Sequence, residues 1–175
     1  MIHRIRLATS SEDIEHAREL MRNYARWTEI DLWFQDFEGE LAALPGKYSA
    51  PGGGLWLADM DSSPAPVGAP ISLPVGVQKG PPVGVVAIRA LADAACELKR
   101  LWVEPDAKGT GLGRELARTA IAFARTAGYQ EMKLDTLKNR MPAAIALYRS
   151  LGFVDAKPYT HNPEPDVLFM TLKLS

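Results

Sequence analysis

A short glycine-rich stretch in the second half of the chain has the residue types best suited to chemistry. Glycine allows positive φ angles and a close approach of the backbone to a ligand. The stretch lies between a predicted strand and a predicted helix, and the first amides of a helix have no internal partner, so they form an anion site with the helix dipole. We expect phosphate groups to bind here, with added charge from Lys108 and Arg114. The residues of this glycine loop are Lys108, Gly109, Thr110, Gly111, Leu112 and Gly113.

Glycine spacing of this kind also occurs in other types of loop. Taken alone, the loop fits a glycine-rich turn without a ligand equally well. A nucleoside triphosphate loop requires G-x-x-x-x-G-K-[ST], and no Gly-Lys-Ser/Thr follows here. A dinucleotide fingerprint requires G-x-G-x-x-G directly after the first strand of a βαβ unit, whereas this chain has G-x-G-x-G, six residues after a strand and late in the sequence.

Two segments resemble the GNAT superfamily of N-acetyltransferases. Residues 101–113 (LWVEPDAKGTGLG) look like its hydrophobic strand, V-x-P and Q/R-x-x-G-x-G/A motif, with Lys108 where Gln or Arg is usual. Residues 146–153 (ALYRSLGF) are similar to its A-x-x-L-Y-x-x-x-G-F helix. The two motifs stand in the family's order and spacing. The resemblance covers residues 83–175 strongly and 1–60 only in layout.

The resemblance implies an α/β fold with a mixed, mostly antiparallel sheet of about seven strands flanked by about four helices. It also implies an enzyme that moves an acetyl group from acetyl-coenzyme A to a primary amine of a small molecule or peptide. The cofactor's pyrophosphate would lie on the amides of the glycine loop. Its pantetheine arm would pair with the strand edge at Leu101, Trp102 and Val103, and the Val103 amide would point at the thioester carbonyl, an oxyanion-type contact.

Direct attack requires an unprotonated amine, and a lysine-like amine has a pKa near ~10.4. Glu97 is the candidate base, because it stands eleven residues before Lys108, where family members that use a glutamate base place it. Strand alternation predicts that Glu97, Lys99 and Leu101 share one face. The alternative is a surface carboxylate paired with Arg100 or a neighbouring strand.

The departing thiolate needs a proton, and Tyr148 matches the family's helix tyrosine, which resembles a general acid. A phenol of pKa ~10 can donate to a thiolate of pKa near ~8.5 with a modest penalty. The alternative is a tyrosine that only packs the helix on the sheet. Asn139 is a further candidate for a cofactor contact, although it stands nine residues before Tyr148, with Met141-Pro142 between them.

The acceptor side is expected among the early helices and the late strand connection, on which substrate selection in the family depends. Five aromatic residues there either line a pocket or pack helices on the sheet: Tyr24, Trp27, Trp33, Phe34 and Phe37. Three carboxylates either attract a cationic amine or lie in solvent: Glu29, Asp31 and Asp36. Two residues lie near the predicted mouth of the site: Tyr159 and His161.

Hydrophobic periodicity supplies the elements that would position these groups. Strands are predicted at 3–8, 55–60, 83–91, 96–103, 131–137, 153–159 and 167–174, and helices at 11–27, 34–44, 111–126 and 143–151. The Pro-, Gly- and Ser-rich segment 61–82 is predicted to be a flexible loop inserted between two strands. This order predicts a mixed sheet with helices on both faces, in a single domain spanning 1–175.

Composition narrows the function classes. A net charge of -1 argues against nucleic-acid binding by bulk electrostatics, and the single cysteine, Cys96, excludes a cysteine-rich zinc site. The three histidines lack metal-ligand spacing, so we expect no metal. No apolar run approaches the roughly 20 residues of a membrane span, and the N-terminus lacks the apolar core of a signal peptide. We expect a cytoplasmic protein, either a monomer or a homodimer, that contacts no membrane.

Two other functions fit parts of the sequence. One is a catalytically silent acyl-coenzyme A-binding sensor or partner module, against which the presence of both Glu97 and Tyr148 argues. The other is a nucleotide or nicotinamide enzyme that uses the same glycine loop. Stabilisation by coenzyme A without turnover would favour the sensor, and stabilisation by ATP or nicotinamide dinucleotides alone would favour the nucleotide enzyme.

Overall fold

The computed structural model describes residues 2–29, 36–61 and 80–174. Its centre is a seven-stranded sheet in the order β1-β2-β3-β4-β5-β7-β6. Neighbouring strands are antiparallel except for the parallel β4–β5 pair, which confirms the predicted mixed, mostly antiparallel sheet. The strands are β1 (Ile2–Leu7), β2 (Gly54–Asp61), β3 (Gly84–Ala90), β4 (Ala95–Val103), β5 (Glu131–Leu137), β6 (Val154–Asp155) and β7 (Val167–Lys173).

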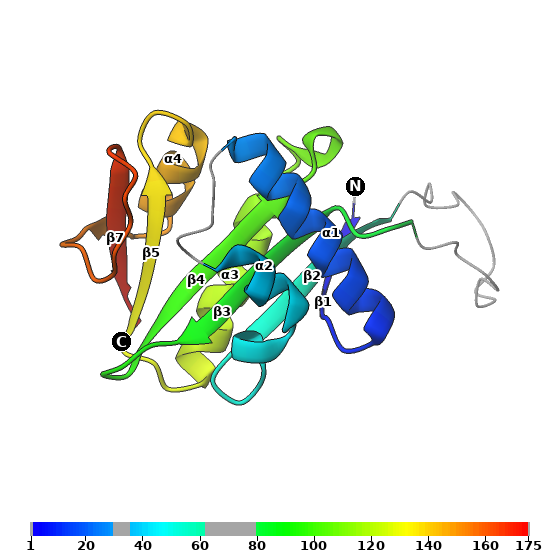
Figure 1. The fold of residues 1–175 in the computed structure, drawn as a ribbon, viewed down its shortest axis with the longest axis horizontal. Helices are drawn as coiled ribbons and strands as arrows, with labels where there is room; N and C mark the ends of the chain where they lie inside the picture. The colour runs from blue at the N-terminus through cyan, green and yellow to red at the C-terminus, as the bar shows by residue number, and fades with distance from the viewer. Residues whose placement is uncertain (1, 30–35, 62–79, 175) are drawn as a thin grey trace.

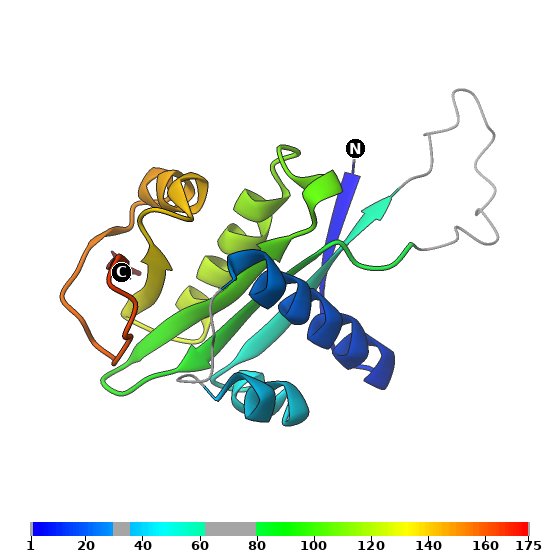
Figure 2. The same cartoon turned by 45° about the horizontal axis from the view of Figure 1, so that its top comes forward.

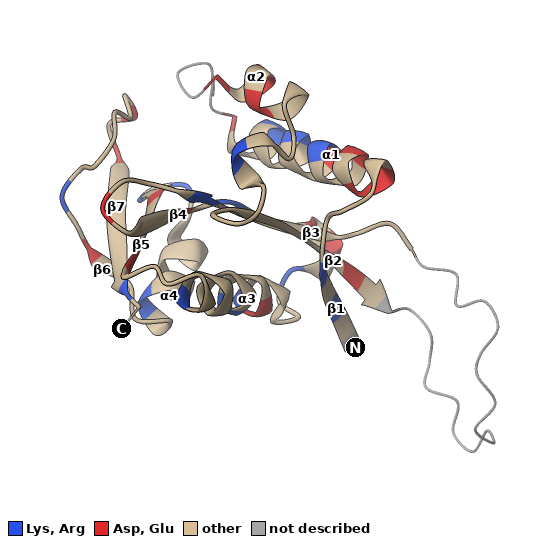
Figure 3. Cartoon of the chain, turned by 90° about the horizontal axis from the view of Figure 1, so that it is seen from below, with Lys and Arg blue, Asp and Glu red and all other residues tan. Residues whose placement is uncertain are grey.

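Helices cover both faces of the sheet (Figure 3). One face carries α1 (Ser11–Thr28) and α2 (Phe37–Ala42), and the other carries α3 (Leu112–Thr126) and α4 (Pro142–Ser150). Short 3-10 turns, η2 (Gly46–Tyr48) and η3 (Pro105–Ala107), follow α2 and β4. None of the helices in the described part of the chain is long and apolar enough to cross a membrane.

Each face of the sheet has its own apolar core. On one side Leu20 and Met21 of α1 pack with Leu57 and Trp102 of the sheet. On the other side Leu116 of α3 belongs to a larger cluster that also includes residues of α4. Full burial of one such side chain stabilises the fold by about 1.5–3 kcal/mol, so the two cores fix α1 and α3 on opposite faces.

The start of α1 is fixed by local chemistry that the sequence indicated. The Ser10 hydroxyl accepts from the Asp13 amide at 3.1 Å, and Asp13 Oδ2 accepts from the Ser10 amide at 3.2 Å, which together form a capping box. Arg6 of β1 then bonds both Asp13, at 2.5 Å, and Asp59 of β2, at 2.9 Å. These ion pairs hold the first turn of α1 against the sheet.

Two predicted segments differ from the structure or lie outside its described part. The strand predicted at 153–159 is only Val154–Asp155, because Pro158 has no amide for a ladder. The backbone amide of Ala156 still donates to Phe169 at 2.8 Å, and the strand pairing stops there. The loop predicted at 61–82 falls mostly on residues 62–79, outside the described residues.

Strand β4 contains a bulge at Arg100. Val85 pairs with Trp102 and Ala87 with Lys99, so Arg100 and Leu101 together lie opposite a single residue of β3. Arg100 has a φ of 57°, in the left-handed region. A bulge interrupts the alternation of side chains. Leu101 therefore packs on the α3 side with Leu98, and the prediction that it shares a face with Glu97 and Lys99 is wrong.

Strands β4 and β5 separate soon after they pair. Their parallel ladder covers only Ala95–Glu131, Cys96–Met132 and Glu97–Lys133. Beyond it the two strands diverge toward their carboxyl ends (Figures 1 and 2), while β5 stays paired with β7 as far as Leu137. This leaves a wedge between β4 and β5, with main-chain groups of β4 on one side.

Candidate functional site

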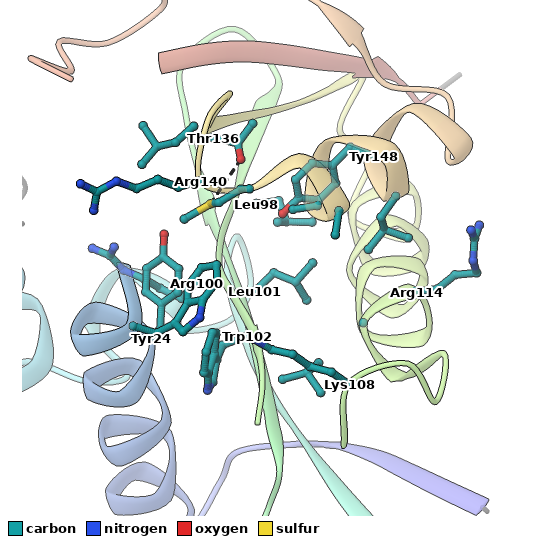
Figure 4. A pocket seen from close by; sticks show the side chains of 18 of the residues that line it. Tyr24, Leu98, Arg100, Leu101, Trp102, Lys108, Arg114, Thr136, Arg140 and Tyr148 are labelled. Carbon is teal, nitrogen blue, oxygen red and sulfur yellow. Dashed lines mark hydrogen bonds between the residues drawn. The ribbon is translucent and has the colours of Figure 1, made fainter. Parts of the chain in front are cut away.

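A cavity of about 590 Å³ occupies the wedge between β4 and β5 (Figure 4). Its walls are the second half of β4, the glycine loop and first turn of α3, the end of β5, and α4. Tyr24 and Trp27 of α1 close the side of the cavity that faces the α1–α2 layer. Segments far apart in the sequence therefore meet around one cavity.

The glycine loop adopts the backbone conformation for which glycine is needed. Gly109 has a φ of 80° and Gly111 a φ of 90°, a region that side chains disfavour. A Cβ atom at either position would meet no atom within 4 Å, so backbone angle and not space requires glycine here. Gly111 is the N-cap of α3 and its carbonyl accepts from the Arg114 amide at 3.0 Å. The loop thus directs the start of a helix toward the cavity.

Most of the predicted loop residues line the cavity. These are Lys108, Gly109, Gly111, Leu112, Gly113 and Arg114. Thr110 does not, and its hydroxyl instead donates to the Ala107 carbonyl at 2.7 Å within the loop. Because the first amides of α3 have no acceptor inside the helix, this end of the cavity presents main-chain donors and two cationic side chains.

Lys108 extends toward α1 in this structure. Its ammonium lies 4.5 Å from the ring centre of Trp27 and 4.4 Å from that of Trp102, and the two indoles are 5.4 Å apart. Such cation–π contacts contribute about 0.5–1 kcal/mol at exposed sites. The Trp102 ring is buried in the α1-side core, as expected for a strand residue. The Lys108 ammonium therefore contacts both indoles while the residue lines the cavity.

Tyr148 projects from α4 into the cavity (Figure 4). Its ring is buried and lies 5.6 Å from that of Phe153. Burial, and next the nearby Tyr24 and Asp135, raise the pKa of Tyr148 above its ordinary value. The phenol therefore stays protonated at neutral pH and is available as a proton donor.

Glu97 is fully buried and does not line the cavity. Arg89 Nε donates to its Oε2 at 2.5 Å and the Tyr159 hydroxyl donates to its Oε1 at 2.8 Å. Lys99 Nζ lies 3.7 Å from the same Oε1. Among the described residues, this carboxylate is thus engaged by three groups just behind the cavity wall, and its assignment as a base stays a prediction.

Asp135 of β5 is a cavity residue that sequence reasoning missed. Its Oδ2 accepts from Asn162 Nδ2 at 2.8 Å, and its Oδ1 lies 3.7 Å from Lys99 Nζ. The side chain is only 10% exposed. The one signal in the sequence was a carboxylate within a predicted strand that ends just before the Tyr148 helix. The separation of β4 from β5, which the sequence did not reveal, places Asp135 in the cavity.

Comparison with known proteins gives a consistent family. The family model described as "Acetyltransferase (GNAT) family" matches residues 14–153. The chain belongs to the GNAT acetyltransferase family. An uncharacterized N-acetyltransferase of Schizosaccharomyces pombe is 34% identical over 165 residues, which are 94% of this chain and 90% of that protein. The chain is thus an N-acetyltransferase by family.

Solved structures share the GNAT fold. A GNAT acetyltransferase of Staphylococcus aureus superposes with a TM-score of 0.75 at 18% identity, over 99% of this chain and 100% of that one. The yncA protein of Salmonella typhimurium, solved with acetyl-coenzyme A, has a TM-score of 0.68 at 21% identity, over 100% of this chain and 95% of that one. At these identities the likeness concerns the fold alone.

On the α1 side of this GNAT domain, two guanidinium groups lie near Tyr24 (Figure 4). Arg140 lines the cavity and its Nη1 donates to the Thr28 carbonyl at the end of α1. Arg100 is buried and bonds Glu40 through Nε at 2.7 Å and Nη2 at 3.1 Å. The suggested pairing of Glu97 with Arg100 is therefore wrong, because the bulge turns Arg100 toward α2. The suggested pairing with a neighbouring strand is confirmed by Arg89 of β3, although Glu97 is buried and not a surface carboxylate.

The other predicted acceptor-side residues are dispersed. Phe37 is buried beneath the Arg100 guanidinium, 4.9 Å away, and is thus a packing residue. Glu29, Asp36 and His161 are exposed, and Trp33, Phe34 and Asp31 lie outside the described residues. Tyr159 bonds Glu97, as described above.

Asn139 does not line the cavity. It is exposed, and its backbone amide donates to Asp166 Oδ2 at 3.0 Å. No group of three or more His, Cys, Asp or Glu side chains able to hold a metal occurs within residues 2–29, 36–61 and 80–174. The chemistry of the cavity therefore centres on Tyr148, Asp135 and the main chain around the glycine loop.

Proposed function

We propose that this GNAT enzyme transfers an acetyl group from acetyl-coenzyme A to a primary amine of a small molecule or peptide by direct attack. The observation that carries the proposal is a single cavity with the glycine loop at one end and the Tyr148 side chain in its wall. A pyrophosphate bound at the loop would direct the rest of the donor along β4 toward Tyr148.

The main chain of β4 supports binding of the donor's amide-rich arm. The Glu104 amide donates to the carbonyl of Val83, the residue just before β3, at 2.8 Å. Because successive amides of a strand point to opposite sides, the Val103 amide faces away from β3 and into the wedge. The donor's pantetheine arm pairs with this edge at Leu101–Val103, and the Val103 amide stabilises the developing oxyanion.

Tyr148 acts as the general acid in this proposal. The nitrogen of the amine forms a bond to the acetyl carbon, the carbon–sulfur bond breaks, and the phenol gives its proton to the departing thiolate. The raised pKa of Tyr148 keeps the proton on the phenol until the thiolate develops. Positive charge from Lys108 and Arg114 holds the donor's phosphates at the far end.

A two-stage experiment tests the proposal. Thermal shift first measures stabilisation by coenzyme A against ATP and nicotinamide dinucleotides. A free-thiol assay with acetyl-coenzyme A and a panel of primary amines then measures turnover. Stabilisation by coenzyme A with no turnover of any amine would make the chain a silent acyl-coenzyme A-binding module instead.

Tyr148→Phe sharpens the test. Loss of a general acid lowers kcat by about 10²-fold or more, while the affinity for coenzyme A should change less than about twofold because the ring remains. Tyr129→Phe is a matched control, since the Tyr129 hydroxyl bonds the Gly52 carbonyl at 2.6 Å and does not line the cavity. An unchanged kcat in Tyr148→Phe would remove the acid role.

Three further statements stay predictions. We propose that residues 1–175 form one acyltransferase domain, that it is a monomer or homodimer, and that it works in the cytoplasm. Light scattering of the purified chain and fractionation of cells that express it test the last two.

A further inference from the structure

The carboxylate of Asp135 has a place in the cavity that the reaction described above does not yet use. Among the residues that the structure describes, two carboxylate side chains line the cavity, Asp135 and Glu164. We propose that Asp135 binds the ammonium group of the acceptor and takes the proton that its nitrogen must lose before attack. This inference rests on the proposed acetyl transfer and names the chemical class of the acceptor, a basic amine that arrives protonated.

Asp135 is held in one orientation by groups that leave part of it open. Asn162 Oδ1 accepts from the Glu164 amide at 3.0 Å, so its Nδ2 is turned toward Asp135 Oδ2, to which it donates at 2.8 Å. Oδ1 has Lys99 Nζ at 3.7 Å, longer than the usual 2.7–3.2 Å of an N–H···O hydrogen bond. Oδ1 therefore keeps the capacity to accept a short hydrogen bond from an ammonium group.

Asp135 and Tyr148 line the same cavity, one as a candidate proton acceptor and the other as a candidate proton donor. The charge of Asp135 contributes to the raised pKa of both Tyr148 and Tyr24, after burial. The carboxylate thus lies within electrostatic range of both phenols that face the cavity. A charge-assisted hydrogen bond to an ammonium is strong in such a poorly hydrated place, because the Asp135 side chain is only 10% exposed.

Glu97 influences the Asp135 carboxylate indirectly, through Lys99. Lys99 Nζ lies 3.7 Å from Glu97 Oε1 and 3.7 Å from Asp135 Oδ1, so it links the fully buried Glu97 carboxylate to the Asp135 carboxylate that lines the cavity. Arg89 and Tyr159 hold the far side of Glu97. Glu97 is therefore a positioning residue in this arrangement, and Asp135 is the carboxylate that touches substrate.

Charged and titratable groups from several described elements surround Asp135. Lys99 of β4 lies 3.7 Å from it, with Glu97 behind Lys99. The charge of Asp135 acts on Tyr148 of α4, Tyr24 of α1 and Tyr159 of the last connection. Arg140, in the loop between β5 and α4, and Glu164 line the same cavity. Their charges include both signs. When one ammonium group of the acceptor binds, the cavity therefore does not acquire a large net positive or negative charge.

The proton balance of the reaction is complete with these two residues. The ammonium gives one proton to the Asp135 carboxylate, which passes it to solvent, and the free amine forms a bond to the thioester carbon. The carbon–sulfur bond breaks and Tyr148 protonates the thiolate. The second nitrogen proton returns to the tyrosinate, so the products are the N-acetylated amine, coenzyme A and one released proton.

Asp135→Asn tests the proposal, because the amide keeps the shape and an acceptor for Asn162 while losing the charge. With the best basic amine from the panel, kcat/KM should fall about 10²-fold or more, and the remaining activity should rise steadily with pH as free amine accumulates. With hydroxylamine, which is unprotonated at neutral pH, the deficit should shrink to less than about tenfold. Stabilisation by coenzyme A should match that of the wild type.

The controls separate failure of this inference from failure of acetyl transfer itself. Glu131→Gln makes the same change on the same strand, where Glu131 bonds Thr171 at 2.7 Å away from the cavity, and should leave kcat/KM unchanged. Asp135→Glu should recover part of the activity. An Asp135→Asn enzyme that loses both acceptors equally, or neither, overturns the proposal, whereas a wild-type protein that acetylates no amine refutes the proposed function instead.

Discussion

The two ends of the cavity are built from different materials. The proposed donor end is contiguous main chain, where Gly109 and Gly111 adopt positive φ angles just before α3. The proposed acceptor end consists of side chains from segments far apart in the sequence, among them Tyr24, Asp135 and Arg140. A site made of backbone is encoded locally, whereas a site made of side chains depends on how the strands meet.

Arg100, which lines the cavity, forms a buried ion pair with Glu40 of α2, and Arg100→Met should have the largest effect on stability. This change leaves Glu40 buried without its bidentate partner, and breaking such a pair costs about 3–5 kcal/mol. Urea unfolding at neutral pH measures the loss. Arg149→Met, which removes an exposed pair with Asp155, should cost less than about 1 kcal/mol.

The stability that the Arg100–Glu40 pair contributes should depend on pH. Burial would raise the pKa of Glu40, but Arg100 and Lys47 outweigh burial and lower it from 4.5 to about 2. A depressed folded pKa stabilises the protein above pH 4.5, and this contribution is lost as the pH falls toward 2. The gap between wild type and Arg100→Met should therefore narrow over that window. A gap that stays constant from pH 7 to 3 contradicts the assignment.

Gly111→Val should weaken coenzyme A binding at the proposed donor end by straining the backbone. A β-branched residue at a φ of 90° is strained by about 1–3 kcal/mol, and relief of that strain would move the first amides of α3. We expect the Kd for coenzyme A, measured by calorimetry, to rise about tenfold or more. Gly128→Val is the matched control, because Gly128 has a φ of 83°, equally open space and no place in the cavity. It should lower stability but leave the Kd unchanged.

Lys108→Met should have the smallest effect, because main-chain donors dominate this end. A single surface charge contributes about 0.3–1 kcal/mol, so the Kd for coenzyme A should rise by no more than about fivefold. The salt dependence of binding should also weaken, since one cation no longer meets the phosphates. Lys108→Arg should restore both. If neither property changes, Lys108 serves only to pack between Trp27 and Trp102.

Much of the fold followed from local patterns. The helix predicted at 111–126 is α3, Leu112–Thr126, and the strand predicted at 131–137 is β5, Glu131–Leu137. Periodicity sufficed there because each element has one buried face. It failed after Asp155, where Pro158 ends a strand that hydrophobicity alone extended to 159.

The site was predicted in part. The glycine loop and Tyr148 do meet around one cavity. Glu97 was predicted as the base from its spacing of eleven residues to Lys108. Spacing in sequence does not reveal that a bulge at Arg100 lies between the two and changes which side chains share a face. With Arg100 at a φ of 57°, strand alternation changes, and Leu101 leaves the face of Lys99.

The sequence by itself determined the donor end, because glycines that need positive φ and a helix start that binds anions are properties of a few consecutive residues. Only the tertiary structure decided the acceptor end. Pairing of β4 with β5 stops after Glu97, and the opening this leaves places Asp135 beside Lys99 and in the same cavity as Tyr148. Where two strands part depends on the bulge, the helices and the packing on both faces together.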